Sequence, residues 1–183
     1  MRDRLADAAW TALQVPLTYL DQGRNLAWAA LAGAEKMVNL RHYPRHDVVD
    51  LDARTRFYYH AHGDHHPAFR GEHGHFHVFA QSGEPGQTEH DFAHLVAISI
   101  DPRGTPLGLF TTNGWVTGEH RMSLSRQTGL LKSFRIQLKG RLAPVARWID
   151  AVIRWQQPLI AQLMRERESR LRAHPQGPKA AWG

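Results

Sequence analysis

The stretch FYYHAH at residues 57–62 and the stretch HGHFHVFA at residues 73–80 decide the fold of this chain. Both alternate with the two-residue period of a β-strand. Successive side chains of a strand point to opposite faces, so histidines two positions apart share one face. If residues 63–72 turn the chain back, the two strands become antiparallel neighbours, and facing side chains then lie about 5 Å apart.

More strands are predicted on the C-terminal side of this pair. Residues 94–101 form a run rich in β-branched side chains, and the turn sequence DPRG at 101–104 leads into LGLFTT at 107–112. Strands separated by short turns are typical of an antiparallel meander. Residues 134–139 also alternate apolar with polar side chains, which predicts one short additional strand.

Helical spacing dominates both ends of the chain. Residues 5–13 and 25–40 are predicted to be helices, which Pro16 and the DQG segment at 21–23 separate. A helix is predicted from Pro144 onward, and Pro158 either kinks it or starts a new one. The predicted fold class is therefore α+β, with a central antiparallel meander sheet flanked by N-terminal and C-terminal helices.

One domain is predicted over residues 1–172. It comprises a helical part (1–40), a histidine-rich sheet (41–118) and a mainly helical, basic part (119–172), and residues 173–183 are expected to be a disordered tail. The N-terminus has no secretory h-region, and the most apolar stretch, Leu26 to Ala34, is much shorter than the ~20 residues that span a bilayer. The sequence therefore predicts a cytoplasmic protein without membrane association.

The composition limits the chemistry that a site could perform. The chain has no cysteine, which excludes disulfides, thiolate zinc sites and iron–sulfur clusters. Any metal must therefore be held by nitrogen and oxygen ligands. A domain of this size buries about 70% of its unfolded surface and needs no metal to hold a core, so a metal here would be functional.

Nine of the 13 histidines lie between His60 and His94. Imidazole is the commonest protein ligand of transition metals. The sequence predicts a transition-metal site, with iron or copper favoured and zinc possible. The predicted ligands are His60, His62, His73, His75, His77 and His94, of which His60, His62, His75 and His77 are the leading set. The alternative is a solvent-facing sheet whose histidines are incidental.

Other residues near the histidines are candidates for catalysis and substrate binding. Tyr58 shares a face with His60 and could donate a proton. Glu72 could complete a set of two histidines and one carboxylate, or orient a ligating imidazole. Three further residues are predicted to bind a substrate, namely Asn113, Trp115 and Arg121.

The leading hypothesis is a small non-haem iron- or copper-dependent oxidoreductase that acts on a small molecule; a zinc hydrolase is a weaker possibility. A non-catalytic metal or haem binder, such as a sensor, is the second hypothesis. The third is a basic nucleic-acid-associated module, because residues 121–183 hold thirteen Lys and Arg but only three Asp and Glu. Sheet edges and the tryptophans Trp148 and Trp155 also allow a homodimer.

Four strings of the central region carry a resemblance to a known family. They are YYHAH, EHGHFHVF, HLVAIS and LFTTNGWVTGE, all of which lie between residues 55 and 120. Together they resemble an uncharacterised bacterial histidine-rich family of unknown function. The resemblance implies that the region is one coherent unit, and it implies no activity.

Overall fold

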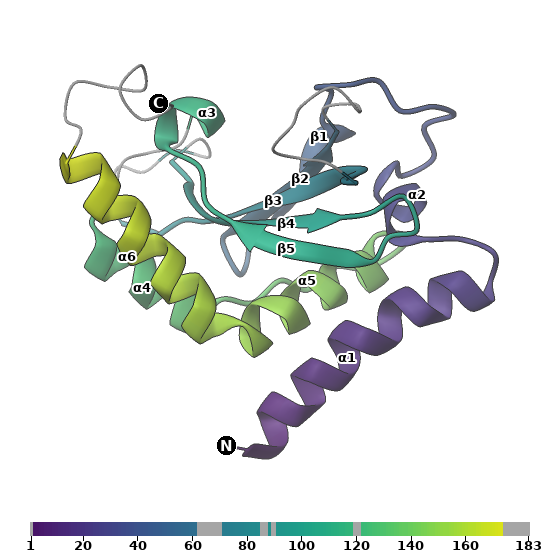
Figure 1. Cartoon of the computed structure of the whole chain (residues 1–183), viewed down its shortest axis with the longest axis horizontal. Helices are drawn as coiled ribbons and strands as arrows, with labels where there is room; N and C mark the ends of the chain where they lie inside the picture. Colours follow the sequence, from purple (N-terminus) through teal and green to yellow (C-terminus); the bar gives the residue numbers. More distant parts are fainter. Residues whose placement is uncertain (1, 62–70, 85–87, 89–90, 119–121, 174–183) are drawn as a thin grey trace.

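The computed structural model describes residues 2–61, 71–84, 88, 91–118 and 122–173. Its helices and strands follow one another in the order shown in Figure 1. They are α1 (Arg2–Asp21), α2 (Leu26–Ala30), β1 (Tyr43–Asp50), β2 (Thr55–His60), β3 (Gly74–Ala80), β4 (Ala93–Ile100), β5 (Pro106–Phe110), α3 (Gly114–Thr117), α4 (Leu124–Ser133), α5 (Ala143–Trp155) and α6 (Gln157–Ala173).

The five strands form one sheet in the order β1-β2-β3-β4-β5, with every neighbouring pair antiparallel. The predicted α+β fold, a central meander with helices at both ends, is confirmed. The two stretches that open the sequence analysis pair as expected, and His60 lies directly opposite His75. No helix in the described part of the chain is long and apolar enough to cross a membrane.

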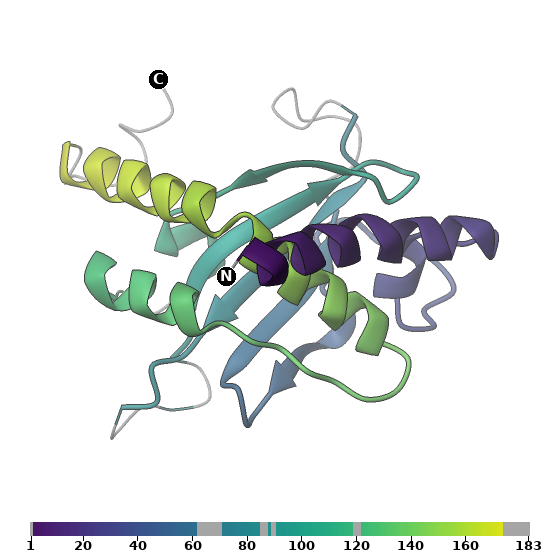
Figure 2. The same cartoon turned by 90° about the horizontal axis from the view of Figure 1, so that it is seen from below.

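The two faces of the sheet have different roles. One face holds the main core, in which Phe57, Tyr59 and Phe76 pack together and are shielded from solvent. Helix α5 covers this face, with the Trp148 ring 5.4 Å from the Phe76 ring. Figure 2 shows α1 lying across the outer side of α5, so the layers run sheet, α5, α1. The other face of the sheet carries the histidines of β2 and β3.

Helix α1 runs through Pro16, so the expectation that this proline separates two helices is wrong. Proline has no backbone N–H, and the carbonyl of Ala12, four residues earlier, therefore lacks its usual helical partner. The indole N–H of Trp148 donates a hydrogen bond to this carbonyl at 3.1 Å. The helix instead ends at Asp21, just before Gly23, which has a left-handed φ of 67°.

Two predicted elements differ from the structure. The helix expected over residues 25–40 is only α2, because the chain turns into the left-handed region at Ala32 (φ 51°) and Gly33 (φ 98°). Residues 134–139 are not a strand. The carboxylates of Asp150 and Asp50 accept the backbone N–H groups of residues 136 and 137, at 3.3 and 2.8 Å, so this segment is satisfied without a neighbouring strand.

The chain termini lie partly outside the described residues. Helix α6 includes Ala173, which the sequence analysis assigns to the disordered tail. The rest of the predicted tail, residues 174–183, lies outside the described residues.

Candidate metal centre

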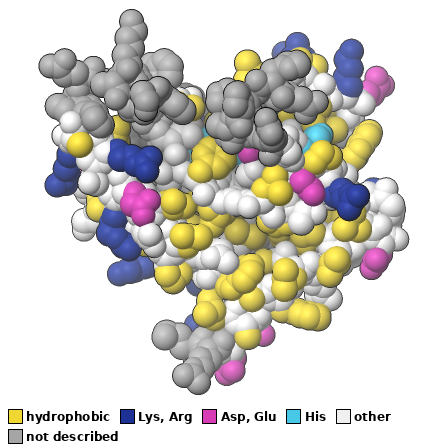
Figure 3. Space-filling model, viewed as in Figure 1, with side chains coloured by type: hydrophobic (Ala, Val, Ile, Leu, Met, Phe, Trp, Pro, Cys, Tyr) yellow, Lys and Arg dark blue, Asp and Glu magenta, His cyan; other side chains and the backbone are white. Residues whose placement is uncertain are grey.

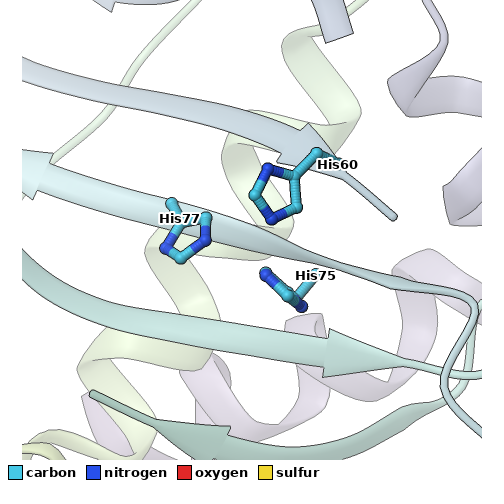
Figure 4. Close-up of side chains that lie close together, drawn as sticks. All are labelled: His60, His75 and His77. Carbon is cyan, nitrogen blue, oxygen red and sulfur yellow. The ribbon is translucent and has the colours of Figure 1, made fainter. Parts of the chain in front are cut away.

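Three histidines lie together on the face of the sheet that α5 does not cover. His60 is the last residue of β2, and His75 and His77 belong to β3. Each offers one ring nitrogen, and these three nitrogens all lie within 4.8 Å of one another. Figure 4 shows the rings pointing toward one another above the strands. This group, called the histidine trio below, follows from the strand period and from the pairing of His60 with His75.

The ring geometry of the trio suits a shared ion. The ring centroids are 4.6 Å apart for His60 and His75, 4.9 Å for His60 and His77, and 4.7 Å for His75 and His77. Their planes meet at 64°, 77° and 85°, so the rings do not stack on one another. Metal–nitrogen bonds of about 2.0–2.1 Å require ligand nitrogens roughly 3.3 Å apart. Small ring rotations would close the remaining distance without moving the strands.

Burial makes the trio unusual for polar side chains. His60 is 9% exposed, His75 1% and His77 2%. Buried polar side chains are normally hydrogen-bonded, and His75 and His77 have the side-chain partners described below. One metal ion could in addition bind all three imidazoles at once.

The carboxylate of Glu72 is hydrogen-bonded to the His75 ring. Nδ1 of His75 donates to Oε1 of Glu72 at 2.5 Å, and Oγ of Ser99 donates to the other oxygen of Glu72 at 2.5 Å. The Glu72 side chain is 5% exposed. Because Nδ1 is bonded to Glu72, Nε2 is the ring nitrogen through which His75 would bind a metal. Glu72 is predicted from the sequence either to bind the metal itself or to orient a ligating imidazole. Its contact with His75 favours the second role.

His94 lies beside the trio because of a β-bulge. Val78 faces Val96 and Phe79 faces His94, so Leu95 is an extra residue in β4. Without the bulge, alternation would turn His94 toward the core face. With it, Nε2 of His94 lies 3.0 Å from Nδ1 of His77. If His77 is the donor of this hydrogen bond, its Nε2 remains for a metal, as in His75.

The electrostatic setting keeps these two rings neutral. Burial lowers the pKa of His77 well below its usual value, and the nearby imidazoles of His94, His75, His60 and His42 lower it further. Burial and the Arg167 guanidinium likewise lower the pKa of His94. Neutral imidazole is the form that binds a metal ion.

The structure separates His73 from the trio. Its Nδ1 lies 2.6 Å from the hydroxyl of Tyr59, which belongs to the core face. Burial and the charge of Glu72 raise the pKa of Tyr59, so its hydroxyl stays protonated in this contact. Of the other predicted site residues, His62 and Arg121 lie outside the described residues.

Aromatic side chains pack next to the histidine trio. Tyr58 is 4% exposed, and its ring lies 5.0 Å from the ring of His77. Phe110 of β5 lies 5.0 Å from His75. His42 stacks on Tyr58 at 3.6 Å and bonds to Asp47 at 3.0 Å. Sequence reasoning missed His42, because no spacing signal connects a residue that precedes β1 with histidines on β2 and β3.

Two of the residues predicted to bind a substrate, Asn113 and Trp115, come directly after β5 in the chain. The side-chain oxygen of Asn113 accepts the N–H of Val116 at 3.2 Å and caps α3. Trp115 belongs to α3, which follows Phe110 by only a few residues.

Replacing Glu72 with glutamine should weaken metal binding by about 10- to 100-fold, because Gln holds His75 less strongly and donates less charge to it. Competition titration with a chromogenic chelator measures the change. Glu35→Gln, on an exposed residue, is the matched control and should leave the affinity unchanged. Equal affinities of Glu72→Gln and the unsubstituted protein would contradict a role for Glu72 in orienting the ligand.

A family model described as "Domain of unknown function (DUF6969)" matches residues 6–181. The expected resemblance to a family of unknown function is thereby confirmed, and it extends well beyond residues 55–120. No curated protein and no solved structure matches the chain.

Proposed function

The chain belongs to the DUF6969 family, whose function is unknown, and from its site we propose that it is a metalloprotein in which the histidine trio binds one transition-metal ion. The observation that carries this proposal is the set of three buried ring nitrogens within 4.8 Å of one another. The extensive core on the opposite face of the sheet favours a functional role for the metal over a structural one.

We propose iron or copper as the bound metal, with zinc as the runner-up. All three candidate ligands are imidazoles, which suit each of these metals, and three protein ligands leave coordination positions open to a small molecule. Bound iron or copper would supply one-electron redox and dioxygen chemistry. On this choice of metal the proposed activity is that of a small-molecule oxidoreductase.

The chain's own residues would serve this chemistry in distinct ways. Glu72 and Ser99 fix the orientation of His75, and His94 fixes that of His77. Tyr58, whose ring lies 5.6 Å from His60, is the phenol closest to the trio and is the proposed proton donor. Substrate contact through Asn113, Trp115 and Arg121 remains a prediction from the sequence.

A non-catalytic metal binder is the second candidate. The observation that favours it is the low exposure of the trio, at most 9% for any of the three side chains, which restricts access of a substrate to the ion. A carrier or sensor needs no open position for a substrate.

Metal analysis of the untagged full chain tests both candidates. The apoprotein is loaded anaerobically with Fe²⁺, Cu²⁺ or Zn²⁺, desalted and assayed for metal content. About one iron or copper per chain, with a visible or EPR spectrum that changes on reduction and on azide addition, supports the oxidoreductase. A redox-active spectrum that azide leaves unchanged favours the non-catalytic binder. Retention of zinc alone overturns the redox assignment, and retention of no metal overturns the metalloprotein.

A further inference from the structure

Helix α1 has two apolar faces, and the structure covers only one of them. Ala8, Ala12, Val15 and Tyr19 are buried on the side that packs against α5. A second row of apolar residues lies on the exposed side of the helix, and we call it the outer seam: Ala6, Trp10, Leu13, Leu17 and Leu20.

The outer seam is strongly exposed. Trp10 is 65% exposed, Leu17 58% and Leu13 56%. Figure 3 shows hydrophobic side chains gathered on the lower part of the molecule, where α1 lies in Figure 1. An exposed apolar row of this kind is typical of a surface that binds another protein, a membrane or a ligand.

The spacing of the seam identifies another helix as the partner. Its residues are separated by four, three, four and three positions, an average of 3.5. This is the period at which one helix packs along another in a coiled coil. The row that packs against α5 has the same four-three-four spacing, so α1 is built to contact a helix on each side.

We propose that the outer seam binds the outer seam of a second copy of this chain, with the two α1 helices antiparallel. The two ends of the seam are equally distant from Leu13, because Ala6 and Leu20 each lie seven positions away, and Trp10 and Leu17 lie three and four positions away. An antiparallel pair therefore places Leu13 against the partner's Leu13 and Ala6 against the partner's Leu20. Such self-complementarity is what a two-fold symmetric interface requires.

The charge of α1 argues against a membrane as the partner. From Arg2 to Asp21 the helix carries two arginines and three aspartates, so it lacks the basic excess that attracts anionic lipids.

The area is appropriate for a dimer. From the exposed fractions, the large side chains of the seam offer roughly 450 Å² of surface per copy. A standard interface buries about 800 Å² per partner. The polar side chains along both edges of the seam would supply the remainder.

Sedimentation equilibrium of the full chain over a wide concentration range tests the dimer. We expect a mass of twice 20.8 kDa for the unsubstituted protein. Leu13→Glu places two carboxylates against each other on the symmetry axis, so the dissociation constant should rise at least ~100-fold. The control Leu159→Glu, at a 42% exposed position on α6, should remain a dimer. A monomer at every concentration overturns the proposal, and unchanged dimerisation of Leu13→Glu overturns the seam.

Disulfide trapping tests the orientation, since the chain has no cysteine of its own. A mixture of Ala6→Cys and Leu20→Cys should form an oxidised heterodimer, whereas Ala6→Cys alone should not cross-link. Cross-linking of Ala6→Cys alone overturns the antiparallel arrangement. Co-sedimentation of monomeric protein with phosphatidylcholine–phosphatidylserine vesicles would assign the seam to a membrane and overturn the dimer.

Discussion

His60→Ala should abolish stoichiometric metal binding, with the affinity falling by roughly 100- to 1,000-fold. Binding free energies of about 10–16 kcal/mol are shared among four ligands in structural zinc sites, so one imidazole contributes about 2.5–4 kcal/mol. His60 is the most informative member of the trio to replace. It ends β2 and is the most exposed of the three, so its loss perturbs the core least.

The measurement is metal content after desalting, combined with a competition titration for each variant. His46→Ala removes an exposed histidine from β1, away from the trio, and serves as the matched control that should keep full metal content. Circular dichroism of both apoproteins should be the same as that of the unsubstituted protein. If His60→Ala retains one tightly bound ion, the trio does not bind the metal.

Trp148→Phe should lower the free energy of unfolding by about 2–4 kcal/mol. The substitution opens a cavity in the core and also leaves the Ala12 carbonyl without its hydrogen bond, because Pro16 cannot supply one. Urea denaturation followed by circular dichroism measures the change.

A double-mutant cycle separates the two causes. Pro16→Ala restores a backbone N–H that can donate to Ala12, so Trp148→Phe should cost about 1–2 kcal/mol less in that background. The cavity remains in both backgrounds and does not contribute to the difference. Additivity of the two substitutions within about 0.5 kcal/mol would show that the indole hydrogen bond does not compensate for the proline.

Trp148 also bears on the predicted homodimer. Trp148 and Trp155 are predicted from the sequence as residues that allow self-association, but Trp148 is completely buried and Trp155 is 37% exposed. A tryptophan on an amphipathic helix is compatible with either the core or an interface, and the sequence does not tell which face of the helix meets the sheet. The proposed dimer therefore forms through the outer seam of α1 rather than through these two tryptophans.

Much of the candidate site could be predicted from local sequence. Strand alternation alone places His75 and His77 on one face, and antiparallel pairing of β2 with β3 brings His60 opposite His75. The α+β class and the meander follow from the same reasoning, because strands that are consecutive in the chain usually lie next to each other in the sheet.

Other features depend on contacts between residues far apart in the chain. His94 reaches His77 only through the bulge at Leu95, and a bulge is set by packing on both faces of the sheet. His73 has the same spacing as His75 and His77, yet its ring is hydrogen-bonded to the buried hydroxyl of Tyr59 and lies apart from the trio. His42 reaches the site from outside the sheet through its stacking on Tyr58.

The sequence by itself therefore determined strands β2 to β5 and the shared face of His75 and His77, because side-chain alternation acts over a few residues, whereas β1 was not predicted. Only the tertiary structure decided which neighbouring groups orient those histidines and which apolar face of α1 is covered. Those outcomes depend on long-range packing and on which partners the buried polar groups find. The spacing of residues along the sequence does not indicate either of them.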